Sequence, residues 1–180
     1  ASSNADIPNY TYSNRAFSSP SIVYGLASAV TINPYCRTVS LVTGLAGTGS
    51  DPPPSPQRAA LLDDMKRRNV ADANEVLASP NTSLVLVRAY LRPGIQAGDT
   101  FDVEVRVPTR SETTSLRGGW LLPARLTEMA VLGEQIRQGS VLGNAEGAVL
   151  VDPSADPKKE IALVTQGRVL GGGIARKSRQ

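Results

Sequence analysis

The 180-residue chain contains no histidine and a single cysteine, Cys36. Histidine is the side chain that most often transfers protons near neutral pH and the commonest metal ligand, so its absence argues against many acid–base sites and metal centres. One cysteine excludes an intrachain disulfide and a cysteine-rich zinc site. We expect Cys36 to be a small buried residue rather than a reactive thiol.

Long apolar runs are also missing. No segment approaches the roughly 20 consecutive apolar residues of a membrane-spanning helix. The first residues show no basic segment followed by an apolar one, so we expect any export signal to have been removed already. The 19 Lys and Arg against 16 Asp and Glu leave a net charge of +3 without a dense basic block, which does not point to nucleic acid.

The remaining composition favours one globular unit, because 41% hydrophobic residues can supply a core for a chain of this length. Residues 1–20 are rich in Ser, Asn, Tyr and Pro, and we predict a mobile leader. Residues 21–175 are predicted to form one domain, followed by a basic tail over 176–180. The predicted fold is α+β: a small, mainly antiparallel sheet with one or two packed helices and long irregular loops.

Strand-like patterns occur in several places. Two apolar, partly β-branched segments, 21–30 and 39–45, flank the turn signal Asn33-Pro34 and predict a hairpin. Segments 83–91 and 100–107 predict an antiparallel pair, and the second alternates strictly between apolar and polar residues. Shorter strand-like pieces follow at 140–142, 147–151 and 167–174.

One helix is well signalled. Ser55 can cap it, Pro56 suits its first position, and Gln57 to Val70 carries apolar residues at Ala59, Leu62 and Met65. A short helical turn is expected from Asp72 to Leu77. The acidic pair Asp63-Asp64 precedes Arg67-Arg68 by four residues, a spacing typical of a solvated helix face rather than of paired catalytic carboxylates.

Two features invite a ligand-binding interpretation. Gly44, Gly47 and Gly49 could cradle a phosphate, but no Lys-Ser/Thr follows and three prolines intervene before the helix, so a structural turn is favoured. Asp99, Asp102 and Glu104 could bind a cation, although alternate acidic residues on a strand are ordinarily solubilising.

The run Thr114–Leu122 joins two apolar, β-like arms through Gly118-Gly119. It contains no evident base or metal ligand, so it predicts shape and packing rather than chemistry.

These blocks, in this order and spacing, resemble the bacterial flagellar P-ring protein family over about residues 39 to 175. The most specific block is Ser-Leu-Arg-Gly-Gly at 115–119, and Gly-Leu-Ala-Gly-Thr-Gly at 44–49 is the second. The helix through Met65 and the strand over 84–87 lie between the two glycine-bearing blocks. The residues that carry the family motifs are Gly44, Gly47, Gly49, Gly98, Asp102, Ser115, Leu116, Arg117, Gly118 and Gly119.

The resemblance implies a periplasmic structural subunit, exported with a cleaved signal, that forms a ring with copies of itself around the distal rod of the flagellum. It implies contact with peptidoglycan and with the outer-membrane L ring, and a bushing in which the rod turns. It implies no catalysis and no cofactor. Because the chain looks like the first half of a typical member, the alternative is a half-length, non-catalytic envelope binding or assembly module. An enzyme would require phosphate at Gly44 to Gly49.

Family members often carry a lysine just before the Ser-Leu-Arg-Gly-Gly block, where a basic group could face an acidic rod. This chain has Thr114 there. A rod-facing charge would therefore come from other basic residues, and the candidates are Arg110, Arg117, Lys66, Arg67 and Arg68.

Overall fold

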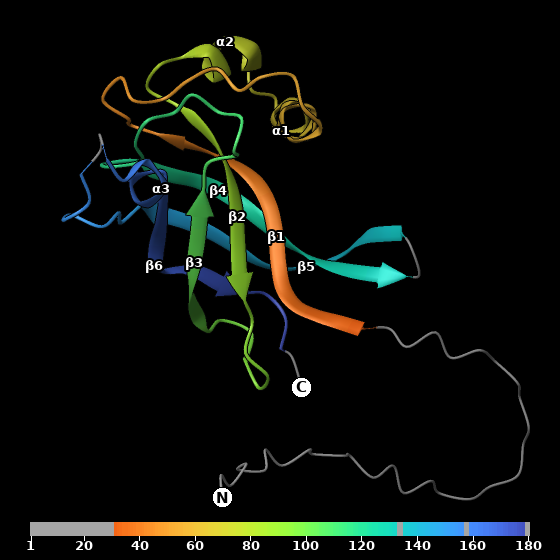
Figure 1. Ribbon diagram of the computed structural model, residues 1–180. Coiled ribbons are helices and arrows are strands. Elements are labelled where there is room, and N and C mark those ends of the chain that lie inside the picture. Colours follow the sequence, from red (N-terminus) through yellow and green to blue (C-terminus); the bar gives the residue numbers. More distant parts are fainter. Residues whose placement is uncertain (1–30, 133–134, 157–158, 179–180) are drawn as a thin grey trace, which may run out of the picture.

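The computed structural model describes residues 31–132, 135–156 and 159–178. Six antiparallel strands close into a barrel in the order β1-β2-β3-β6-β5-β4 (Figure 1). The strands are β1 (Thr31–Thr43), β2 (Ser83–Tyr90), β3 (Thr100–Arg106), β4 (Trp120–Leu132), β5 (Gln135–Ala148) and β6 (Gln166–Ala175). Helices α1 (Pro56–Arg67), α2 (Ala73–Ala78) and α3 (Ile161–Val164) accompany them, and no described helix is long and apolar enough to cross a membrane.

The closed barrel contradicts the predicted α+β fold with a small open sheet. The error arose mainly in β4 and β5, strands of 13 and 14 residues. The sequence predicted no long strand over β4, and in the region of β5 it predicted only short pieces at 140–142 and 147–151. Their pairing contains several register shifts, and β4 includes Pro123. Bulges and prolines interrupt the two-residue alternation by which a strand is recognised in a sequence.

The predicted hairpin around Asn33-Pro34 is also wrong. Both residues lie inside β1, which pairs with β2 on one side and with β4 on the other. The partner segment proposed for that hairpin, 21–30, lies outside the described residues, as do the leader 1–20 and the last two residues of the basic tail. Of that tail, Ser178 accepts a hydrogen bond from the Ala97 amide at 3.1 Å.

The pairing of β2 with β3 is confirmed. As predicted for β3, Val103 and Val105 are buried inside the barrel while Asp102 and Arg106 are exposed. Cys36 is fully buried in the same core, as expected. The core residues alternate along β2 and β3 and are joined by leucines of the connecting loops, so the barrel interior is a continuous apolar cluster.

The helices cover only one part of the barrel surface. Leu61 and Met65 of α1 and Leu77 of α2 pack with Leu41 and Leu84, which point outward from β1 and β2. Figure 1 shows both helices over the same end of the barrel. The rest of the outer face of β1, β2, β3 and β6 therefore carries no helical cover from α1 or α2.

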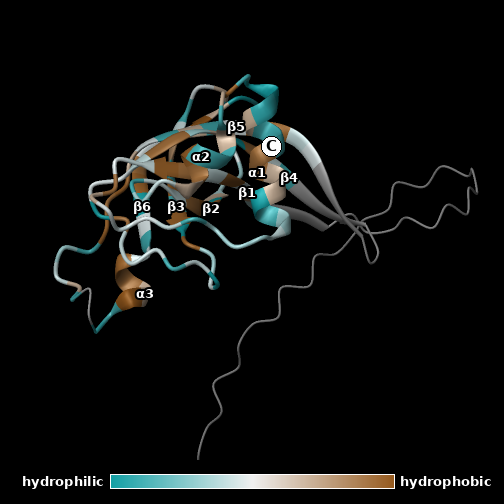
Figure 2. Cartoon of the chain, turned by 90° about the horizontal axis from the view of Figure 1, so that it is seen from above, coloured by the Kyte–Doolittle hydropathy of each residue, from teal (hydrophilic) through white to brown (hydrophobic). Residues whose placement is uncertain are grey.

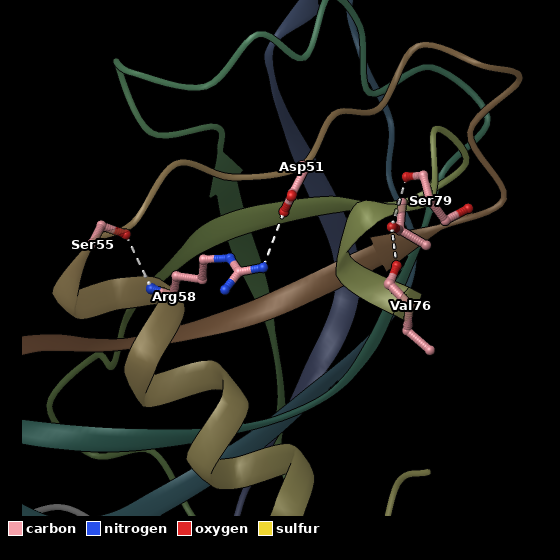
Figure 3. Close-up of polar contacts among 6 residues, drawn as sticks. Asp51, Ser55, Arg58, Val76 and Ser79 are labelled. Atoms are coloured by element: carbon pink, nitrogen blue, oxygen red, sulfur yellow. Dashed lines mark hydrogen bonds and ion pairs between the residues drawn. The ribbon is translucent and has the colours of Figure 1, made fainter. Parts of the chain in front are cut away.

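Helix α1 begins as predicted. The Ser55 hydroxyl accepts a hydrogen bond from the Arg58 amide at 3.1 Å, and the Arg58 guanidinium reaches Asp51 at 3.3 Å (Figure 3). The helix ends at Arg67 rather than Val70, because Asn69 adopts a left-handed conformation with φ of 55°.

The predicted second helical turn is present as α2. Its end is fixed by the Thr82 hydroxyl, which contacts the carbonyls of Val76 and Ser79 (Figure 3). Helix α3, by contrast, was not predicted.

Candidate interaction surface

The two glycine-bearing motifs meet in space. We call residues 44–50, 79–83 and 113–119 the turn cluster. The amide of Leu45 donates to the Asn81 carbonyl at 3.0 Å, that of Gly47 to the Asn81 side chain at 3.2 Å, and that of Gly49 to the Pro80 carbonyl at 2.8 Å. These amides are therefore occupied by acceptors of the chain itself, which favours the structural turn over the phosphate cradle.

Gly49 is required by space rather than by a ligand. A Cβ atom at this position would overlap the Thr82 carbonyl and would lie 2.8 Å from the Pro80 oxygen. Beside it, the hydroxyl of Thr113 lies 2.7 Å from that of Ser83 and 3.0 Å from that of Ser50. These small hydroxyls satisfy one another in a buried position, so the cluster is closely packed and internally bonded.

The Ser-Leu-Arg-Gly-Gly block anchors the other side of the turn cluster. Leu116 is fully buried, and its amide donates to the Val164 carbonyl of α3 at 2.9 Å. Gly118 has φ of 73°, and a Cβ on Gly119 would overlap Val42 in β1. The block thus sets the turn into β4.

Arg117 points back onto the protein. Its guanidinium donates to the carbonyls of Asp152, Pro153 and Ala155 at 2.9, 3.3 and 2.6 Å. In the same loop, hydrogen bonds from the hydroxyl and amide of Ser154 hold the pKa of Asp152 below its ordinary value of 3.8. Arg117 therefore fastens the 152–155 loop to the turn cluster.

The acidic residues near β3 have structural partners. Asp102 accepts a hydrogen bond from the Gly171 amide, and Asp99 accepts one from the Gln96 amide, both at 2.8 Å. The Gly98 amide donates to the Ala175 carbonyl at 2.8 Å. Among the described residues there is no cluster of three or more candidate metal ligands.

The candidates for a rod-facing charge lie in three separate segments. Arg67 and Arg68, at the end of α1, form ion pairs with Asp63 and Asp64 at 2.7 Å each. This pairing follows the four-residue spacing expected from the sequence. Lys66 is exposed beside them, whereas Arg110 is exposed in the loop between β3 and β4.

A charged surface that sequence analysis missed lies on the outer sheet face. The strand register places Arg37 of β1 opposite Arg88 of β2, Arg88 opposite Glu104 of β3, and Glu104 opposite Arg168 of β6. We call these four residues, together with Arg106, the arginine face. The alternation in β3 predicted that Glu104 and Arg106 would face solvent. Their cross-strand partners could not be predicted in the same way, because they depend on pairings between segments far apart in the sequence.

One acidic residue holds two of these arginines. Glu104 contacts Arg88 at 2.6 Å and Arg168 at 3.7 Å. The hydrogen bond and the charge of Glu104 raise the pKa of Arg88 above its ordinary value, and the Arg88 guanidinium also lies 5.2 Å from the centre of the Tyr35 ring. Arg88 is thus fixed in place by groups on both neighbouring strands.

The arginine face forms part of an open depression of about 1260 Å³. Helix α1 contributes to its lining, and Leu150, Leu163 and Leu170 contribute apolar surface. Leu150 pairs with Arg168 through an isolated bridge, and Leu170 follows Arg168 by two residues on the same strand face. Figure 2 shows the apolar helix α3, which carries Leu163, beside the barrel.

Comparison with known proteins shows the family to which the chain is related. The model of the family described as flagellar P-ring protein matches residues 37–180. The chain belongs to this family. The match includes both glycine-bearing motifs, the helix α1 and the whole arginine face.

Individual relatives agree. The chain is 32% identical over 140 residues to the flagellar P-ring protein of Caulobacter vibrioides, which covers 76% of this chain and 36% of the relative. It is 34% identical over 139 residues to that of Thermotoga maritima, covering 77% and 39%. It is 29% identical over 139 residues to that of Escherichia fergusonii, covering 76% and 36%. The chain thus corresponds to little more than a third of the length of these relatives.

Proposed function

We propose that the chain is a structural, non-catalytic component of the flagellar basal body, a subunit of the P ring in the periplasm. In this proposal it assembles with copies of itself around the distal rod, next to the L ring and the peptidoglycan, and the ring acts as a bushing for the rod. The match of residues 37–180 to the flagellar P-ring protein family carries the proposal.

The geometry of the turn cluster supports a scaffolding role. The amides of Leu45, Gly47 and Gly49 are spent on the chain's own acceptors, and Arg117 binds three carbonyls of a neighbouring loop. A site for chemistry needs polar groups that converge on an open position, whereas these groups converge on one another. The motif residues Gly44, Gly98, Asp102, Ser115 and Leu116 serve the same architecture in this proposal.

For the contact with the rod, Lys66 and Arg110 are the basic candidates that substitution can test most directly. Both are exposed, and charge reversal at either leaves the ion pairs of Arg67 and Arg68 intact. Reversal at Arg117 would instead release the 152–155 loop and would confuse a loss of folding with a loss of rod contact.

The test is to locate the chain in the cell. A tagged chain expressed in its native host is expected to copurify with intact basal bodies and to be labelled at the ring nearest the peptidoglycan in electron micrographs. The matched control is a tagged, unrelated periplasmic protein at the same level. A stably expressed chain that is absent from basal bodies would contradict ring membership and would favour the assembly-module alternative.

The rod-facing assignment has its own readout. The variants Lys66→Glu and Arg110→Glu are expected to reduce swimming while the chain remains folded and abundant in the periplasm. Unchanged assembly and motility in both variants would remove these two residues from the rod contact without affecting ring membership.

A further inference from the structure

The arginine face contains an arrangement that the fold itself does not favour. Arg37 and Arg88 are direct cross-strand partners, and like charges in such positions are destabilising. The carboxylate of Glu104 serves Arg88 and Arg168, and among the described residues no ion pair is formed by Arg37 or Arg106. Unfavourable charge that the fold does not neutralise is a mark of a binding surface.

The charge of the whole depression points the same way. Seven arginines and four acidic residues line it. Three of the acids, Asp63, Asp64 and Glu104, already form short ion pairs with arginines of the same surface. A partner that neutralises the remaining positive charge must therefore supply carboxylates or other anions.

The apolar end of the depression narrows the class of partner. Leu150 is 53% exposed and Leu170 is 60% exposed, and both adjoin Arg168. Leucine side chains of this exposure gain from contact with apolar groups, which a nucleic-acid backbone does not offer. The depression of about 1260 Å³ also exceeds the usual size of a small-molecule site, about 300–1,000 Å³.

We propose that the arginine face and the adjoining leucines bind an extended, acidic polypeptide segment that carries apolar residues. Its carboxylates pair with Arg37, Arg106 and Arg168, and one or more apolar side chains rest on Leu150 and Leu170. The inference goes beyond ring membership, since it assigns a particular face and a particular partner chemistry.

The experiment measures peptide binding to the full chain by fluorescence anisotropy at low salt. The probe is a labelled twelve-residue peptide of repeated Glu-Glu-Leu units. The comparison probes are a Glu-Glu-Ser peptide, a Lys-Lys-Leu peptide and a twelve-nucleotide oligothymidylate. We expect the Glu-Glu-Leu peptide to bind at least tenfold more tightly than each of them, with an affinity that falls as salt is added.

Two matched pairs of variants locate the site. Arg37→Gln combined with Arg106→Gln is expected to weaken binding at least tenfold, whereas Arg92→Gln combined with Lys177→Gln removes the same charge outside the depression and is expected to change binding less than twofold. Leu170→Ser is expected to weaken binding several-fold. Its control, Ile174→Ser, alters a residue that is 51% exposed on the same strand outside the depression, and little change is expected.

Three results would overturn the proposal: no binding of the Glu-Glu-Leu peptide at millimolar concentration, equal loss in the two double variants, or binding of the oligonucleotide as tight as that of the peptide. Circular dichroism of each variant separates loss of binding from loss of folding. Because binding is measured on the isolated chain, failure here leaves the localisation in the basal body as a separate question.

Discussion

The turn cluster and the arginine face treat polar groups in opposite ways. In the turn cluster, the amides of the glycine loop and the hydroxyls of Ser83 and Thr113 find partners within the chain. On the arginine face, two arginines stand directly opposite each other across β1 and β2, and one carboxylate serves two guanidinium groups. The turn cluster, which carries the family motifs, therefore uses its polar groups to stabilise the fold. The arginine face, which carries no motif recognised in the sequence, retains positive charge that the chain does not neutralise.

The sharpest way to break this contrast is to truncate one leucine in each region. Leu116 of the turn cluster is fully buried, and Leu116→Ala is expected to lower the free energy of unfolding by about 4 kcal/mol, because lost burial and the residual cavity add. Leu170 adjoins the arginine face and is 60% exposed, so Leu170→Ala should change the free energy of unfolding by less than about 0.5 kcal/mol. Urea unfolding of both variants checks the pair, and similar losses would show that the contrast in burial is not real.

A smaller effect is expected from one added methyl group in the glycine loop. In Gly49→Ala the new Cβ meets backbone carbonyls of residues 80 and 82, which cannot swing aside, and a loss of about 2–3 kcal/mol is expected. Gly47→Ala has open space around the Cβ but a φ of 76°, so only the left-handed backbone penalty of about 1 kcal/mol applies. Thermal unfolding compares the two variants. If Gly47→Ala is the less stable, the close approach of the backbone carbonyls at 80 and 82 is not what requires glycine at position 49.

On the arginine face we expect a substitution to stabilise the protein rather than to destabilise it. Arg37→Gln removes a like-charge cross-strand pair, so we expect it to raise the free energy of unfolding by about 0.5 kcal/mol at low salt. Arg106→Gln is the control, because its cross-strand partners Leu86 and Gln166 are uncharged and little change is expected. The gain should shrink in 0.5 M salt, because the Debye length falls to about a few ångströms and the repulsion between the two exposed arginines is screened. A loss of stability in Arg37→Gln would mean that the pairing is not repulsive.

The same contrast explains what could be predicted from the sequence. Helix α1 was found because its signals are local: a capping Ser55, Pro56 at the first position, and apolar residues at helical spacing through Met65. The β2–β3 pair was found because alternation and a short glycine loop define it within 25 residues of chain, from Ser83 to Val107. The interpretation of Gly118 and Gly119 as residues of shape rather than chemistry rests on the run 114–122, which contains no evident base or metal ligand.

What was missed depends on long-range pairing. Closure of the barrel requires β1 to pair with β4 and β3 with β6, and the bulged strands β4 and β5 do not show a clean two-residue period. The arginine face inherits this difficulty, since Arg37, Glu104 and Arg168 become neighbours only when the register of four strands is known. Even on α1 the buried residues are Leu61 and Met65, while Ala59, one of the apolar residues of the predicted pattern, is exposed.

The smallest expected effect tests the loop that Arg117 fastens to the turn cluster. Ser154 lowers the pKa of Asp152 by donating from its hydroxyl and its amide, so Ser154→Ala removes the first of these bonds. The pKa of Asp152 is then expected to rise toward its ordinary value of 3.8, as followed by NMR titration of its carboxyl carbon. Ser178→Ala, in the 176–180 segment, serves as the control and should leave that pKa unchanged.

The direction of the pH dependence follows from the sign of this shift. Because the folded-state pKa of Asp152 lies below its unfolded value, the Ser154 bond stabilises the fold above pH 3.8, and this contribution is lost as the pH falls through the lower folded value. The exposed position of Asp152 keeps the effect small. A pKa of Asp152 that stays low in Ser154→Ala would assign the shift to the Ser154 amide and to the charge of Arg117. Arg117, which fastens the 152–155 loop to the turn cluster, would then also be the side chain that sets the pKa of Asp152.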